Sequence, residues 1–166
     1  ISNYLINVEN MNLKGQIKTH NAQDISFGYR FSSFKDDEII LLARFKLQKE
    51  DPDIIQNKKN KASQGRKTNQ PLKFRSSGSV FKNPENNHAA GYLIDKAGLK
   101  GTRIGNAEIS HHHANFFINH GNASASDITS LIRIARKAVF KKYGLELELE
   151  LKTIGIKEQD LKENAW

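Results

Sequence analysis

The spacing of hydrophobic and polar residues changes along the chain. In residues 1–50 apolar side chains alternate with polar ones, as at Tyr4, Ile6 and Val8, and residues 39–47 form a longer apolar run. Alternation with a period of two places every second side chain on one face of a sheet. We therefore predict short β-strands in residues 1–50, with a turn at Lys14 and Gly15.

A polar segment follows these strands. Asp51 and Pro52 interrupt the apolar run, and residues 56–69 are almost wholly polar and basic. Such a segment is typical of a linker or of an exposed helix, and the sequence leaves both possibilities open. We predict a domain boundary at residues 51–76.

The clearest helix signal covers residues 124–143. Ser124 and Asp127 fit a capping box, in which the hydroxyl and the carboxylate satisfy free amides of the first turn. Gly144 is placed to end the helix. Apolar residues recur at helical spacing, namely Ile128, Leu131, Ile132, Ala135 and Val139. Basic residues are predicted on the other faces, namely Arg133, Arg136, Lys137 and Lys141.

Shorter elements surround this helix. Residues 88–97 read as a short helix, and residues 107–110 and 115–119 read as strands. In residues 145–151 leucine alternates with glutamate or lysine, which predicts a strand with one buried face. Strands, a boundary, and then mixed helices and strands indicate the α+β class.

The amino-acid composition excludes some kinds of functional site and partner. The chain has no cysteine, so disulfides and cysteine nucleophiles are excluded. No apolar run approaches the roughly 18 residues of a membrane helix, so we expect no membrane partner. The lack of cysteine is compatible with a reducing compartment, and we expect a cytoplasmic location. The chain opens without Met, and we interpret it as part of a longer protein. A net charge of +8 favours anionic partners, although an AT-biased coding sequence rich in lysine gives the same excess.

Three segments carry candidate chemistry. Residues 76–84 combine small residues with Ser79, Lys82 and Asn83, which suits an anionic ligand, although a tight turn leading into a strand has the same composition. The histidines at 111–113 have no further ligand at a recognised spacing, so we expect no metal site. Arg30 lies among aromatic residues and suits either carboxylate binding or the rim of a core.

Seven ordered blocks together are more specific than any one of them. They are Phe27-Gly28-Tyr29-Arg30 with Ser33-Phe34-Lys35; Gln70-Pro71-Leu72; Gly78-Ser79-Val80-Phe81-Lys82-Asn83-Pro84; Ala90-Gly91-Tyr92-Leu93-Ile94-Asp95; Ala97-Gly98-Leu99-Lys100-Gly101; His113-Ala114-Asn115-Phe116 with Asn119; and Leu147-Glu148-Leu149-Glu150-Leu151 before Ile154-Gly155. In this order they resemble the UDP-N-acetylenolpyruvoylglucosamine reductase family, also called UDP-N-acetylmuramate dehydrogenase.

The resemblance implies a reaction of peptidoglycan precursor synthesis. In this family NADPH reduces a bound FAD, which reduces UDP-N-acetylglucosamine enolpyruvate to UDP-N-acetylmuramate. Ser79 matches the proton donor, and Arg30 and Glu150 match the other catalytic positions. The remaining matches are binding positions: Asn83 and Lys67 for the substrate diphosphate, and Tyr29 and Lys152 for the cofactor.

The resemblance also implies a domain layout. Residues 1–50 would be the C-terminal remnant of an FAD-binding domain of the vanillyl-alcohol-oxidase (PCMH-like) type, and 77–155 a mixed α+β substrate-binding domain of the family's compact subclass. Residues 156–166 form a charged tail without an assigned role. Leu151 and Lys152 stand where many members have Val-Arg, which puts the contact made there in doubt. Because the N-terminal flavin domain is missing, we expect the chain alone to be inactive.

Two alternatives stay open. The lysine-rich residues 58–75 suit a non-catalytic basic module that binds nucleic acid, but no recognition helix or aromatic-studded strand supports it, so we expect no nucleic-acid partner. In the second alternative another chain supplies the flavin half of a larger assembly.

Overall fold

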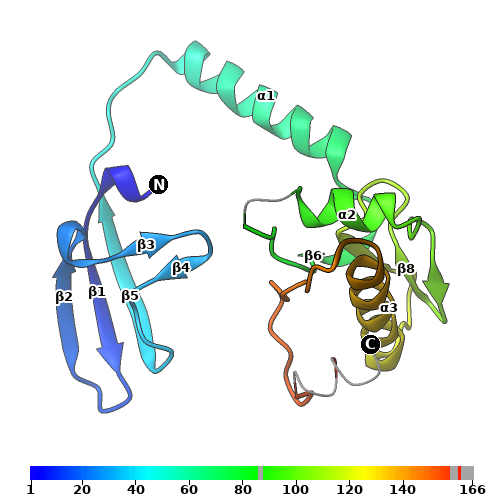
Figure 1. Cartoon of the computed structure of the whole chain (residues 1–166). Helices are drawn as coiled ribbons and strands as arrows, with labels where there is room; N and C mark the ends of the chain where they lie inside the picture. Colours follow the sequence, from blue (N-terminus) through cyan, green and yellow to red (C-terminus); the bar gives the residue numbers. More distant parts are fainter. Residues whose placement is uncertain (86–87, 158–160, 162–166) are drawn as a thin grey trace. The chain divides into compact units, whose positions relative to one another are not determined.

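The computed structural model describes residues 1–85, 88–157 and 161. The chain divides into two compact units, Ile1–Gln56 and Asn57–Trp166 (Figure 1). Both units combine strands with helical turns, and the mixed α+β class predicted from the sequence is confirmed. Within the described residues, no helix combines the length and the apolar composition needed to cross a bilayer.

The first unit is built on a three-stranded antiparallel sheet in the order β2-β1-β5 (Figure 1). Its strands are β1 (Leu5–Asn12), β2 (Ile17–Asn21) and β5 (Glu38–Phe45). A second, two-stranded hairpin joins β3 (Phe27–Gly28) to β4 (Phe31–Ser32). Short 3-10 turns, η1 (Ser2–Tyr4) and η2 (Ala22–Asp24), complete the unit.

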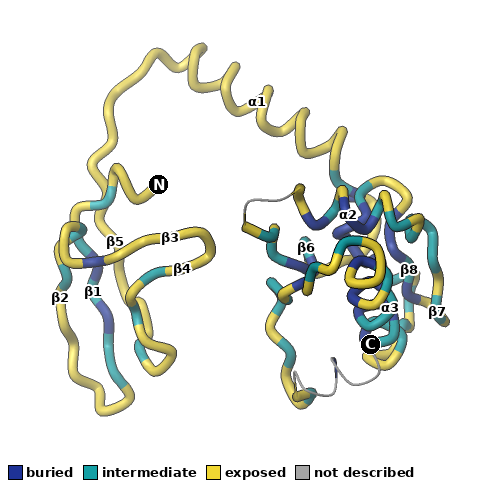
Figure 2. Tube along the Cα trace, viewed as in Figure 1, coloured by how far each residue is buried: buried dark blue, intermediate teal, exposed yellow. Residues whose placement is uncertain are grey.

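Most apolar side chains of this sheet are exposed. Val8 and Ile25 are its buried hydrophobic residues among those described, and Figure 2 shows most of the unit as exposed. The exposed set includes four consecutive residues of β5, namely Ile39, Ile40, Leu41 and Leu42. Three short strands cannot bury a large core by themselves. The main core of the described residues therefore lies in the second unit.

Helix α1 (Pro52–Asn69) covers most of the segment predicted as a linker or an exposed helix. The Asp51 carboxylate begins it by accepting hydrogen bonds from the amides of Asp53 (2.8 Å) and Ile54 (3.4 Å). None of its residues is buried. The segment is therefore an exposed helix with a capped N-terminus and no buried apolar face.

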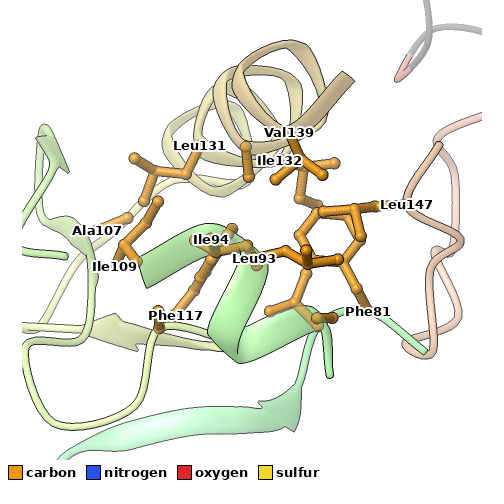
Figure 3. Packing of buried hydrophobic residues seen from close by; sticks show 14 residues of the cluster. Phe81, Leu93, Ile94, Ala107, Ile109, Phe117, Leu131, Ile132, Val139 and Leu147 are labelled. Atoms are coloured by element: carbon orange, nitrogen blue, oxygen red, sulfur yellow. The ribbon is translucent and has the colours of Figure 1, made fainter. Parts of the chain in front are cut away.

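The second unit contains a four-stranded antiparallel sheet in the order β6-β9-β8-β7. Its strands are β6 (Arg75–Ser79), β7 (Arg103–Ile104), β8 (Ala107–Ile109) and β9 (Phe116–Asn119), and its helices are α2 (Ala90–Lys96) and α3 (Ala125–Tyr143). Figure 3 shows Leu131, Ile132 and Val139 of α3 packed over Leu93 and Ile94 of α2. All five side chains are at most 1% exposed.

Helix α3 has the predicted ends, and of the four basic residues predicted on its other faces only Arg136 is buried. Ser124 and Asp127 form the capping box, and Gly144 ends the helix with a φ of +66°. Arg136, predicted on a polar face, is instead 3% exposed. Its Nε donates to the carbonyl of Leu147 (2.9 Å) and an Nη donates to that of Leu161 (3.3 Å). The arginine therefore holds the chain that follows α3.

The strand predicted at residues 145–151 is wrong. Leu147 is buried as the alternation implies, but the segment makes only an isolated bridge between Phe81 and Leu149. The amide of Lys82 donates to the carbonyl of Glu148 (2.8 Å), and the amide of Glu150 donates to that of Val80 (2.9 Å). Only a short extended segment beyond β6 is available as a neighbour, so a longer ladder does not form.

Replacing Arg136 with Met should lower the free energy of unfolding by about 2–3 kcal/mol, because two buried carbonyls lose a charged donor. Urea denaturation followed by circular dichroism measures the change. Lys137→Met, at the exposed neighbouring position, should stay within about 0.5 kcal/mol of the parent chain. Equal losses in the two variants would show that Arg136 does not anchor this segment.

Candidate active site

Strand β6 contains a bulge directly before Ser79. Ser76 pairs with Ile118 and Ser79 pairs with Phe116, so three steps on β6 oppose two on β9. Gly78 has a φ of +84°, a conformation that residues with a Cβ rarely adopt. The glycine therefore lies in a bulge within a strand, not in a turn before one. Bulges change the direction of the side chains that follow them.

The backbone after Ser79 is held from two sides. On one side, the carbonyl of Asn115 accepts from the amide of Val80 (2.9 Å), and the Asn115 side chain bonds both polar groups of the Phe81 backbone. On the other side, the carbonyl of Val80 accepts from the amide of Glu150 (2.9 Å). We call residues 79–82 the junction segment.

Ser79 and Asn83 line the same cavity, whose volume is about 290 Å³. Its other polar lining residues include Tyr92, Lys100 and His113. Lys100 forms an ion pair with Asp95 at 2.8 Å. The cavity thus combines a hydroxyl, an amide and an imidazole with a pair of opposite charges, Lys100 and Asp95, and these hydrogen-bonding groups suit an oxygen-rich ligand.

Asn83 also has a structural role. Its side-chain oxygen accepts a hydrogen bond from the amide of Ala90 (3.1 Å), the first residue of α2. The N-cap residue Ala89 has no side chain able to do this. Asn83 therefore fixes the start of α2 at the wall of the cavity. Any ligand that Asn83 binds must leave this contact in place.

His113 is held in one orientation beside α2. Its Nδ1 accepts the amide hydrogen of Asn115 (3.2 Å), which places the proton of a neutral ring on Nε2. A Cβ on Gly91 would lie 2.9 Å from the imidazole Cε1, so glycine permits this close approach. Burial lowers the pKa of His113, and the charge of Lys100 lowers it further. His113 is therefore a neutral hydrogen-bond donor near neutral pH.

The other two histidines of the triplet point elsewhere. The Nε2 of His112 lies 2.5 Å from the carbonyl oxygen of Thr68 at the end of α1. The ring of His111 packs over Gly101, which has a φ of +78°. Among the described residues, no three His, Cys, Asp or Glu side chains are grouped so that they could hold a metal ion.

The other predicted site residues of this unit do not line the Ser79 cavity. Glu150 is half-buried and joins Ser79 through the backbone of Val80. Lys67 lines a separate cavity of about 700 Å³ with Phe74 and His112. Lys152 lines a third cavity, of about 460 Å³. His112 lies in the walls of both the Ser79 and the Lys67 cavities, which makes these two neighbours.

Tyr29 and Arg30 belong to the first unit, where they form the two-residue loop of the β3–β4 hairpin. Arg30 has a φ of +56°, which is strained for a residue with a Cβ, and its guanidinium lies 5.0 Å from the centre of the Tyr29 ring. Such strain persists where the surrounding structure imposes it and is common at functional sites. The hairpin therefore presents a stacked cation and ring.

Comparison with known proteins shows the family of the chain. A family model described as the C-terminal domain of UDP-N-acetylenolpyruvoylglucosamine reductase matches residues 70–154. This chain belongs to that reductase family. The matched range contains the junction segment and every residue named above for the Ser79 cavity.

Individual relatives of this reductase family extend the match to most of the chain. The reductase of Rickettsia prowazekii is 44% identical over 91% of this chain and 51% of its own length. That of Exiguobacterium sibiricum is 44% identical over 86% of this chain and 47% of its own length. The chain thus spans about half the length of the curated relatives it matches.

A solved structure gives the same result. The crystal structure of the reductase from Thermus caldophilus matches with a TM-score of 0.77 and 36% identity. The match covers 92% of this chain and 54% of that one. It therefore includes residues beyond the range of the family model.

Sequence reasoning missed two residues of the site. Asn115 lay within a block of the reductase resemblance, yet its hydrogen bonds to Phe81 have no local signal because the two residues are 34 positions apart. His113 lay in the same block, but its own chemistry was considered only for a metal site within the histidine triplet. The adjacent signal was Gly91, a glycine inside a short predicted helix, which marks a close approach by another group.

The pKa of His113 should lie below 6.5 in a proton NMR titration of its Cε1 hydrogen. Lys100→Met should raise this pKa, because it removes a nearby positive charge. Lys96→Met, at an exposed position on α2, serves as the control and should leave the pKa unchanged. A parent pKa above 6.5 would contradict the buried, neutral assignment.

The same shift predicts a pH dependence of stability. A histidine with a lowered folded-state pKa stabilises the fold fully above the unfolded-state pKa, near 6.5. As the pH falls through 6.5 toward the folded-state pKa, the unfolded chain takes up the proton first and this stability is lost. His113→Asn should therefore show a smaller fall in the free energy of unfolding between neutral and mildly acidic pH, measured by urea denaturation.

Proposed function

We propose that this chain carries the substrate-binding part of a reductase that converts UDP-N-acetylglucosamine enolpyruvate to UDP-N-acetylmuramate in peptidoglycan precursor synthesis. The observation that carries the proposal is the junction segment. It places Ser79 in the wall of a cavity with polar and charged groups and bonds the Glu150 backbone to the next residue. These two residues match two of the family's three catalytic positions. The membership of the reductase family supports the same assignment.

Ser79 is the proton donor in this proposal. Reduction adds a hydride to the terminal carbon of the enolpyruvyl group, and the neighbouring carbon then takes a proton from the Ser79 hydroxyl. A hydroxyl is a weak acid, so the transfer requires a strongly basic carbon and a fixed donor. The bulge at Gly78 and the hydrogen bonds on both sides of Val80 supply that fixed position.

Arg30 and Glu150 act on the substrate carboxylate. Negative charge grows on this group as the hydride arrives, and the Arg30 guanidinium stabilises it where it develops. The Glu150 side chain orients the enolic carboxylate by hydrogen bonding. Arg30 lies at the tip of a hairpin with a strained backbone, which supports a functional role for that conformation.

Asn83 and Lys67 bind the diphosphate. The two residues line neighbouring cavities whose walls share His112. The proposed substrate has a diphosphate between a nucleoside and an amino sugar, and it is long enough to occupy more than one cavity. The amide of Asn83 would donate to a phosphate oxygen while its oxygen continues to cap α2.

The residues assigned to the cofactor fit a flavin by their chemistry. Tyr29 presents an exposed ring stacked by Arg30, which suits the edge of a flat, electron-poor ring system, and Lys152 supplies an exposed cation. When bound, FAD reduced by NADPH supplies the hydride. In this proposal residues 1–50 belong to a flavin-binding domain of the vanillyl-alcohol-oxidase type, residues 51–76 connect it to the substrate-binding domain at 77–155, and the complete protein acts in the cytoplasm.

Substrate binding to this chain should depend on the charge at position 83. Asn83→Asp keeps the oxygen that caps α2 but places a negative charge in the cavity. Calorimetric titration with UDP-N-acetylglucosamine enolpyruvate should show affinity at least about tenfold lower, a loss of about 1.4 kcal/mol. Unchanged affinity in this variant would show that Asn83 is only a cap and would remove the diphosphate assignment.

Turnover should depend on Ser79 in a complete reductase that contains this chain. Ser79→Ala should lower kcat by at least about 100-fold with little change in KM, because the lost group acts only in the proton transfer. Steady-state oxidation of NADPH measures both constants. Ser77→Ala, an exposed serine of the same strand, is the matched control and should retain its turnover. Equal activity of the two variants would remove Ser79 as the donor.

A further inference from the structure

We propose that Asn115 is a positioning residue that holds Ser79 and Glu150 in the relative positions needed for catalysis. The proposal rests on the function proposed above and adds a residue to which no catalytic or binding role is assigned. Asn115 lines the cavity wall but is 3% exposed, and its side chain forms hydrogen bonds with the backbone of Phe81. Asn115 therefore acts through its neighbours.

Asn115 replaces a strand partner at a point where the sheet ends. Its side-chain oxygen accepts from the amide of Phe81 at 2.9 Å, and its side-chain nitrogen donates to the carbonyl of Phe81 at 2.8 Å. This pair of bonds reproduces the exchange that two backbones make in an antiparallel ladder. Its own carbonyl also accepts from the amide of Val80 at 2.9 Å. Three bonds from one residue thus fix two consecutive residues of the junction segment.

Those two residues connect the proposed catalytic groups. Val80 follows Ser79 directly, and its carbonyl accepts from the amide of Glu150 at 2.9 Å. The Phe81 ring is 1% exposed in the core, so the junction segment is anchored by packing as well as by hydrogen bonds. A shift of Val80 would move Ser79 and the Glu150 backbone together. Holding reacting groups in place contributes strongly to catalysis, and a displacement of about 1 Å can cost about 100-fold in rate.

Asn119 offers a matched control on the same strand. Its side-chain oxygen accepts from the amides of Gly121 (2.8 Å) and Ala123 (3.1 Å), which lie in the loop before α3. It is therefore an asparagine that fixes a loop by the same kind of bond, but away from the junction segment. Asn119→Ala reports the general cost of losing such a residue.

The first test is amide hydrogen exchange of this chain followed by NMR. Asn115→Asp retains an acceptor for Phe81 but loses the donor, and Asn115→Ala loses both. In each variant the amide hydrogens of Val80, Phe81 and Glu150 should exchange at least about tenfold faster, because losing a buried hydrogen bond makes local opening of this segment easier. Amides of α3 should change little, and Asn119→Ala should leave the three junction amides protected. Unchanged protection in both Asn115 variants would overturn the proposal.

The second test separates positioning from general stability in a complete reductase. Asn115→Asp should lower the rate of enolpyruvate reduction by about 100-fold, while reduction of the flavin by NADPH keeps its rate and KM for the substrate changes little. A structural defect would slow both half-reactions. Equal slowing of both steps, or no slowing, would contradict a positioning role.

The two proposals can fail separately. If Ser79→Ala retains full turnover, the assignment of the proton donor is wrong whatever the exchange data show. If Ser79→Ala is inactive but Asn115→Asp keeps both its protection and its rate, only the role of Asn115 is wrong.

Discussion

The junction segment has hydrogen-bonding partners on both sides, and the arrangement of the candidate site depends on this double attachment. Asn115 bonds Val80 and Phe81 from one side, and residues 148–150 bond Val80 and Lys82 from the other. The buried Phe81 ring anchors the same stretch in the core beneath α3. Segments distant in sequence thus meet at one short piece of backbone. The attachment also explains why residues 145–151 are ordered without forming a regular strand.

Around this attachment the described residues of the second unit line several separate cavities. The Ser79 cavity and the Lys67 cavity share a wall at His112, whose ring contacts the end of α1. The charges are also local: Lys100 lies beside Asp95, and Lys82 pairs with Glu148. Anion binding therefore depends less on the overall excess of positive charge than on the position of each cation.

The sequence predicted the elements whose signals are local. The α3 capping box and the Gly144 stop need only neighbouring residues, and both predictions are confirmed. The strands predicted in the first unit are also confirmed, because these segments pair with one another. The predictions that were wrong depend on residues that are farther apart in the sequence. Alternation at 145–151 correctly indicated the burial of Leu147 but could not show whether a neighbouring strand was available. Arg136 looked like a surface residue because its carbonyl partners follow much later in the chain.

The candidate site was predicted in part, for the same reason. Ser79 was found through its block of small residues and the family resemblance, and the structure shows why the glycine before it is needed. The link between Ser79 and Glu150 through Val80 has no signal in either local pattern. Asn115 is similar, because its bonds to Phe81 exist only after the chain has folded.

The most direct test of the account is an NMR titration of the labelled chain with UDP-N-acetylglucosamine enolpyruvate. If this chain carries the substrate site, the amide signals of Ser79, Gly91 and Lys100 around the 290 Å³ cavity should shift together and saturate. Shifts confined to the Ile1–Gln56 unit, or no shifts from a folded chain at millimolar ligand, would contradict the central claim.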